Sequence, residues 1–117
     1  MSQRTDQVAE EIKKSVSQIL LKEIHDPRMG FVTITRVAVT RDLKQAKIFY
    51  SVLGDDAQKK STEQVFLEYR RELRRMVAKQ VQTKFAIVLQ FVFDKSIEDS
   101  FRINEILKQI KGKEEKG

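Results

Sequence analysis

The run KEIHDPRMGFVTITRVAVTRDLKQAKIFYSVL, residues 22–53, decides the fold because it contains a helix end, a turn and two strands without interruption. The helical segment before it ends at Asp26 and Pro27, the only proline of the chain. Proline supplies no N–H to a helix and pushes the residue before it out of the helical region. Gly30 then permits the turn that leads into the first strand.

A β-hairpin is predicted on the C-terminal side of that turn. Residues 31–39 follow a β-branched pattern of period two, in which Phe31, Thr33, Thr35, Val37 and Val39 alternate with Val32, Ile34, Arg36 and Ala38. Residues 41–44, RDLK, separate this strand from residues 46–52, AKIFYSV, which predict the return strand.

Amphipathic helices are predicted on both sides of the hairpin. The first covers residues 5–24, with one apolar face made by Val8, Ile12, Val16, Ile19, Leu20 and Ile24. After a loop at residues 54–56, Ser61 or Thr62 with Glu63 is expected to begin a second helix. Its apolar stripe, which should lie against the sheet, consists of Phe66, Tyr69, Leu73, Met76, Val77 and Gln80 or Val81.

The remaining sequence predicts one more strand and one more helix. Residues 86–93, AIVLQFVF, are almost entirely apolar and predict a strand that is buried on both faces or nearly so. Ser96 is expected to cap a last helix that reaches Ile110, and residues 111–117, KGKEEKG, predict a charged, disordered tail. The predicted order is α-β-β-α-β-α. A helix between the second and third strands indicates an α+β fold, with a three-stranded mixed sheet and the helices on one face.

One side of the second helix carries a concentration of positive charge. At 100° per residue, Arg71, Arg74, Arg75 and Lys79 fall within an arc of roughly 140°, with Glu68 and Glu72 at its margin. Four cations on one rigid rod suit a row of backbone phosphates. The alternative is a solvated face on which the two glutamates form weak ion pairs with the arginines.

Composition sets the broad class. The 117 residues predict a single domain of 1–110, followed by the tail. A net charge of +6 with a pI of about 9.7 suits a polyanionic partner, although on charge alone a merely solvated basic surface is the more common case. The absence of cysteine excludes disulfides and thiolate chemistry and is compatible with the cytoplasm. Neither a signal peptide nor a membrane-spanning run is recognisable, so a soluble chain is expected.

Catalytic and cofactor chemistry is not predicted. The single histidine, His25, lies at a helix end, where an imidazole can meet the last carbonyls of the helix, and this capping role is favoured over a catalytic one. No P-loop, dinucleotide-binding glycine pattern or metal-binding histidine spacing is present. The aromatic residues are expected in the core, and an edge position is an open alternative only for Tyr50 and Tyr69, because of their polar hydroxyls.

Two groups of residues resemble the bacterial ribosome-binding factor A family. The first is D-P-R-x-G-(hydrophobic)-V-T at residues 26–33, followed by V-x-x-D-L-x-x-A-K-(aliphatic) at residues 39–48. The second is FVFDKSIE at residues 91–98, followed by Arg102, Ile103 and Leu107. The spacing between them fits without a gap over residues 3–110, and several matches at fixed spacing are stronger than one short motif.

The resemblance implies a fold related to the type II KH domain without its phosphate-clamping G-x-x-G loop, which this sequence also lacks. The family has an A-x-G kink in the second helix, but Tyr69, Arg70 and Arg71 occupy that position here. Tyrosine and arginine favour a continuous helix more than glycine does, so a weak kink or a straight helix is expected. The family's proline before the last strand is replaced by Ile87.

By the same resemblance, the chain is expected to be a non-catalytic, monomeric cytoplasmic factor that binds the immature small ribosomal subunit. It would promote late maturation and 5′-end processing of the rRNA and support growth in the cold. The expected RNA contacts include, besides the cationic helix face, Arg28, Arg70 and Lys84. For Arg28 an equally open interpretation is a surface residue without an RNA contact, which simply follows the helix stop. The alternative function is a basic protein-interaction module that acts through a sheet edge or the C-terminal helix.

Overall fold

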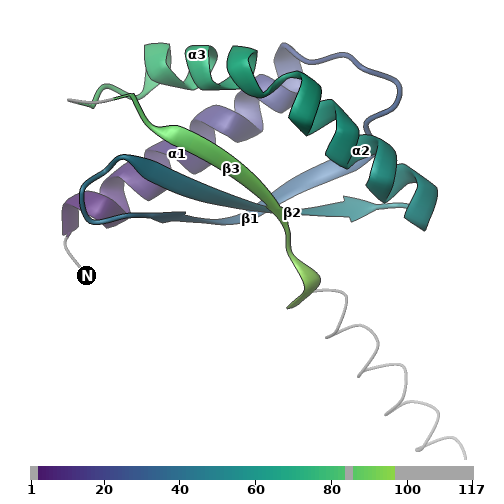
Figure 1. Cartoon of the computed structure of the whole chain (residues 1–117), viewed down its shortest axis with the longest axis horizontal. Helices are drawn as coiled ribbons and strands as arrows, with labels where there is room; N and C mark the ends of the chain where they lie inside the picture. Colours follow the sequence, from purple (N-terminus) through teal and green to yellow (C-terminus); the bar gives the residue numbers. More distant parts are fainter. Residues whose placement is uncertain (1–2, 84–85, 97–117) are drawn as a thin grey trace, which may run out of the picture.

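The computed structural model describes residues 3–83 and 86–96 and shows an α+β fold, as predicted. The elements are α1 (Gln3–Lys22), β1 (Phe31–Val39), β2 (Gln45–Leu53), α2 (Asp56–Glu68), α3 (Arg70–Gln80) and β3 (Val88–Phe93). Figure 1 shows the three helices together on one side of the sheet, which confirms the predicted layer arrangement. The predicted last helix, the tail and Lys84 lie outside the described residues.

The sheet is mixed and has the order β1-β2-β3, so β2 is the central strand. The pair β1–β2 is antiparallel, as the hairpin prediction requires, and β2–β3 is parallel because α2 and α3 form the crossover. The prediction that residues 86–93 are buried on both faces is wrong. β3 is an edge strand on which Leu89 is buried while Val88 is 46% exposed. The helices therefore cover only one of its faces.

A β-bulge in β1 changes which side chains reach the core. The register moves from Ile34↔Tyr50 to Arg36↔Phe49, which leaves Thr35 without a paired residue on β2. Because two residues of β1 oppose one of β2 there, the alternation shifts by one position. The hydroxyl of Thr35 donates to Asp94 Oδ2 at 2.6 Å, which anchors the bulge to the end of β3.

As a consequence, the simple alternation predicted for residues 31–39 is wrong beyond the bulge. Val37 and Val39 pack against the core on the side of Ile34, whereas Arg36 is exposed on the opposite side.

The core lies between the sheet and the helices. All six apolar positions predicted for the first helix are buried, and Ile12 and Val16 are completely inaccessible. The ring of Phe66 stacks on Phe91 with centroids 4.5 Å apart and contacts Tyr50 at 4.6 Å. Tyr50 is only 3% exposed, so it lies in the core and not at an edge, and burial raises the pKa of its hydroxyl to about 12.

The second helix begins earlier than predicted, at Asp56. The carboxylate of Asp55 accepts the backbone N–H of Gln58 at 2.8 Å, and the Gln58 side chain accepts the N–H of Asp55, which together form a capping box. Ser61 and Thr62 have another role inside the helix. They bind the segment before β1, since Ser61 Oγ donates to the carbonyl of Arg28 at 2.6 Å and Thr62 Oγ1 accepts the N–H of Gly30 at 2.9 Å.

A break at Tyr69 separates α2 from α3, so the expected continuous or weakly kinked helix is wrong. The break lies within residues 69–71, where the family's A-x-G kink is expected, although no glycine is present there. Tyr69 has φ −93° and ψ 8°, outside the α-helical values, and Figure 1 shows the two helices pointing in different directions. Contacts that replace the missing glycine are described below.

Candidate nucleic-acid interface

Packing of the apolar side of α3 fixes the direction of its charged side. Leu73 and Val77 are buried, at 0% and 3% exposure, and Met76 is partly buried beside them. The end of the helix is tied to α1, where Ser15 Oγ donates to Gln80 Oε1 at 2.6 Å. With one side held in the core, the other side of the rod must face solvent.

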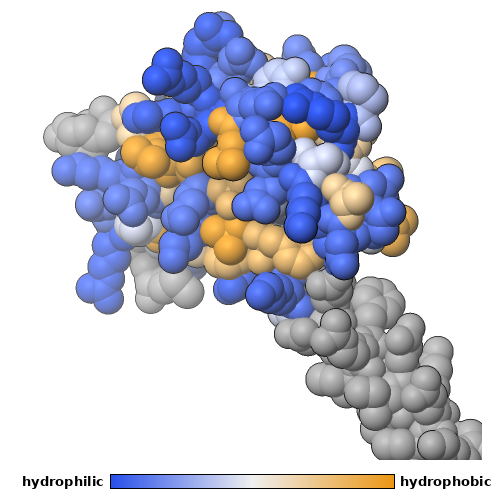
Figure 2. Space-filling model, turned by 45° about the vertical axis from the view of Figure 1, so that its right-hand side comes forward, coloured by the Kyte–Doolittle hydropathy of each residue, from blue (hydrophilic) through white to orange (hydrophobic). Residues whose placement is uncertain are grey.

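Four basic residues of α3 share that solvent side and are all exposed. We call them the cationic face: Arg71, Arg74, Arg75 and Lys79. Arg70, also exposed, lies at its N-terminal border. The top of the molecule, where Figure 1 places α3, is predominantly hydrophilic in Figure 2.

The two glutamates that could neutralise the cationic face do not do so. Among the described residues, the ion pairs join Arg28 to Asp26 and to Glu68, and Lys59 to Asp56, so none involves α3. Glu68 is used by Arg28, and Glu72, the one acid of α3, forms no ion pair with the rest of the described chain. The cationic face therefore keeps its full positive charge toward solvent.

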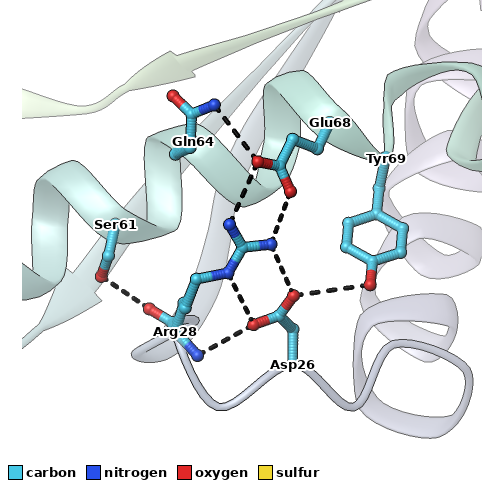
Figure 3. A network of polar contacts seen from close by, with 6 residues as sticks. All are labelled: Asp26, Arg28, Ser61, Gln64, Glu68 and Tyr69. Atoms are coloured by element: carbon cyan, nitrogen blue, oxygen red, sulfur yellow. Dashed lines mark hydrogen bonds and ion pairs between the residues drawn. The ribbon is translucent and has the colours of Figure 1, made fainter.

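Arg28 lies in a network of polar contacts that connects the segment after α1 to the α2–α3 break (Figure 3). Its guanidinium donates from Nε to Asp26 Oδ1 at 3.1 Å and from Nη2 to Asp26 Oδ2 at 2.8 Å. It also donates from Nη1 to Glu68 Oε1 at 3.1 Å and from Nη2 to Glu68 Oε2. Four of its five N–H groups are thus occupied by carboxylates.

These contacts shift the acidities of the groups involved. Hydrogen bonds from Arg28 hold the pKa of Asp26 at about 2, and they also lower the pKa of Glu68. The hydroxyl of Tyr69 donates to Asp26 Oδ2 at 3.4 Å, a long hydrogen bond. Both the last residue of α2 and the residue at the break are therefore held by the 26–28 segment, and we attribute the break to these contacts.

The expected contact between Arg28 and RNA is not favoured by this geometry, because a phosphate would have to displace two carboxylates. We interpret Arg28 as a residue that positions α3. His25 has the predicted capping role, since its Nε2 donates to the carbonyl of Lys22, the last residue of α1, at 2.8 Å. Lys84 lies outside the described residues.

Sequence reasoning missed a second charged surface on the side of the sheet opposite the helices. It is formed by the exposed or partly exposed side chains of three neighbouring strands. We call it the open sheet face: Arg36, Ala38, Lys47, Phe49, Gln90 and Val92. Arg36 and Lys47 are visible in the sequence as cations within predicted strands. No local pattern predicts the bulge that turns Arg36 to this side of the sheet.

Metal binding and membrane insertion find no support in the described part of the chain. No group of three or more histidine, aspartate or glutamate side chains comes close enough together there to hold a metal ion. None of the helices among those residues is both long and apolar enough to span a bilayer.

Comparison with known proteins decides the family. A family model described as ribosome-binding factor A matches residues 4–107. The chain belongs to the ribosome-binding factor A family. The ribosome-binding factor A of Geobacter sulfurreducens is 46% identical over 110 residues, which cover 94% of this chain and 93% of that protein. The resemblance inferred from the motifs at residues 26–48 and 91–107 is thereby confirmed.

Solved structures of ribosome-binding factor A have the same fold. The solution NMR structure of a Thermotoga maritima protein assigned as a ribosome binding factor A is 29% identical, with a TM-score of 0.71 over 84% of this chain and 93% of that one. A homology model of the Thermus thermophilus ribosome binding factor A, as fitted into the cryo-EM map of a complex with the 30S subunit, is 14% identical. Its TM-score is 0.60, and the match covers 82% of this chain and 97% of that one.

Proposed function

We propose that the chain is a non-catalytic factor that binds the rRNA of the immature small ribosomal subunit through the cationic face of α3. The observation that carries the proposal is the set of four exposed cations on one side of a rigid helix, none of which pairs with a carboxylate among the described residues. Such a row attracts backbone phosphates through charge, without reading the sequence of the RNA. Membership of the ribosome-binding factor A family supports this partner.

The proposed mechanism is a shift of an RNA equilibrium. A ligand changes the population of two RNA arrangements only when it binds one of them better than the other. Because α3 is fixed by Leu73, Val77 and the Arg28 network, its cations project from a rod of fixed direction and would bind one arrangement of phosphates better than another. Binding would favour that arrangement during late maturation and 5′-end processing of the rRNA.

The proposal extends to the cellular setting. Residues 1–110 would form the ribosome-binding domain and residues 111–117 an accessory tail, in a cytoplasmic monomer that uses no cofactor or small-molecule substrate. Stabilisation of one RNA arrangement would matter most at low temperature, where misfolded RNA rearranges slowly. Growth in the cold should therefore depend on the factor.

Charge reversal of the cationic face tests the proposal. We expect the quadruple change of Arg71, Arg74, Arg75 and Lys79 to Glu to abolish co-sedimentation of the protein with immature small subunits. The matched control reverses four exposed cations of α1 and α2: Arg4, Lys14, Lys22 and Lys60. It has the same net charge and should retain most binding. Normal co-sedimentation of the α3 variant, with an unchanged circular dichroism spectrum, would refute the proposed surface.

A protein-interaction role has one specific observation in its favour. Phe31 and Leu53 face each other across β1 and β2 and are 73% and 79% exposed, and Leu21 on α1 is 75% exposed. In addition, the outer edge of β1 is unpaired within the described sheet. If this end of the molecule carried the binding, Phe31→Ser with Leu53→Ser would abolish it at any salt concentration, and the α3 variant would bind normally.

A further inference from the structure

The open sheet face has the composition of a nucleic-acid surface. None of the residues of β1, β2 or β3 is an aspartate or glutamate, while Arg36 and Lys47 are exposed on this side. Among the described residues neither cation forms an ion pair within 4 Å. Asp94 follows the end of β3, and its oxygens accept hydrogen bonds from Ser96 and Thr35. These bonds and the charge of Arg36 lower its pKa.

The centre of the face is a stacked pair of planar groups. The guanidinium carbon of Arg36 lies 3.9 Å from the centroid of the Phe49 ring. Arg36, Phe49 and Val92 form one row across the three strands. Since Arg36 is exposed, its outer side is open to solvent, and nucleic-acid bases stack on both aromatic rings and guanidinium planes.

A hollow lies next to this pair on the same face. It has a volume of about 270 Å³, and its lining includes Ala38, Lys47, Val88 and Gln90. Ala38, Lys47 and Gln90 form the neighbouring row across the strands, two residues from the first row and thus about 7 Å along the strand. Ala38 and Val88 provide apolar contact, the amide of Gln90 provides a donor and an acceptor, and Lys47 provides a charge for a phosphate.

We propose that the open sheet face is a second RNA site, which binds a single-stranded segment by stacking one base on Arg36 and Phe49 and placing the next in the hollow beside Lys47. Charge favours RNA over a protein partner here, because the six residues of the face include two cations and no acid. Asp94 beside Arg36 is only 7% exposed and is bonded to Thr35 and Ser96. The site rests on the proposed function in that RNA is the ligand. It lies on the opposite side of the sheet from α3, so the protein would hold two RNA elements at once.

The absence of tryptophan from the chain allows a direct test. In Phe49→Trp the single indole reports stacking, and we expect its emission to be quenched saturably by an eight-nucleotide single-stranded RNA. The control, Leu67→Trp, places the indole on α2 at a site that is 57% exposed, and its emission should not change. Inorganic polyphosphate, which has charge but no bases, should not quench either variant.

Affinity measurements by anisotropy complete the test. Phe49→Leu keeps an apolar side chain but removes the ring, and should weaken binding of the same RNA roughly 5- to 150-fold, the range for loss of one stacked base. Equal quenching at both tryptophans, no effect of Phe49→Leu, or crosslinks from position 49 in intact subunits to protein alone would overturn the proposal.

The two RNA proposals fail in different ways. Quenching at Phe49→Trp together with normal co-sedimentation of the α3 charge-reversal variant would support the open sheet face and refute the cationic face. Loss of co-sedimentation in the α3 variant without any quenching at Phe49→Trp would support the cationic face and overturn the second site.

Discussion

The salt dependence of RNA binding should reveal how many phosphates the cationic face of α3 contacts. If each of its four cations neutralises one phosphate, α3 contributes a slope of about −2.8 to −3.6 to a plot of log K against log salt, at about −0.7 to −0.9 per phosphate. Between 50 and 200 mM salt, that contribution alone corresponds to a loss of affinity of roughly 50- to 150-fold.

Single neutral substitutions show how much each cation contributes to the slope. Arg75→Gln should make the slope shallower by about 0.7–0.9, and each further neutral substitution on the cationic face should add a similar step. Titrations of labelled small-subunit rRNA at four or more salt concentrations measure these steps.

Two control variants distinguish phosphate contact from a general effect of charge. Glu72→Gln raises the net charge without adding a phosphate contact, so it should leave the slope unchanged. Lys60→Gln removes an exposed cation of α2 that lies off the cationic face, so its slope should also be unchanged. An unaltered slope in Arg75→Gln, or an equal change in Lys60→Gln, would refute the assignment of α3 as the phosphate-binding rod.

Three further predictions concern stability. Leu73→Ala, at a completely buried position of α3, should lower the free energy of unfolding in urea by about 2–5 kcal/mol, and a loss below 1 kcal/mol would contradict the packing described for α3. Asp55→Ala removes the cap of α2 and should cost about 0.5–2 kcal/mol by the same measurement, whereas no loss would argue against the capping box. The pKa of Asp26 is about 2 in the folded protein and near 4 in the unfolded chain, so its contribution to stability is present above pH 4 and disappears as the pH falls through 2. The stability difference between the wild type and Asp26→Asn should therefore shrink over that interval, and a constant difference would refute the role of the ionised carboxylate.

Local patterns in the sequence were sufficient for most of the fold. The helix stop before Pro27, the hairpin and the apolar stripe of the first helix depend on neighbouring residues, and the structure has each of them, although α1 already ends at Lys22. The solvent side of α3 was predictable for the same reason, because helical periodicity alone places Arg71, Arg74 and Arg75 together.

The features that were missed depend on contacts between distant residues. The sequence predicts a start of α2 that is too late, because serine and threonine are common N-cap residues. Here Ser61 and Thr62 lie inside the helix and bind residues 28–30 instead. The bulge at Thr35 is anchored by Asp94, 59 residues away, and nothing in the local sequence indicates it. The same is true of Arg28, whose second carboxylate partner, Glu68, is 40 residues distant.

The break at Tyr69 also has a consequence for when the protein becomes active. In a chain with glycine at this point, the local backbone would favour the bend, and an isolated peptide of the two helices would show it. Here the bend depends on Asp26 and Arg28, which reach the joint only after α1 and the hairpin have assembled. An isolated peptide of residues 56–80 should then form a straight helix, and a newly made chain would aim its arginines correctly only once the whole domain is complete.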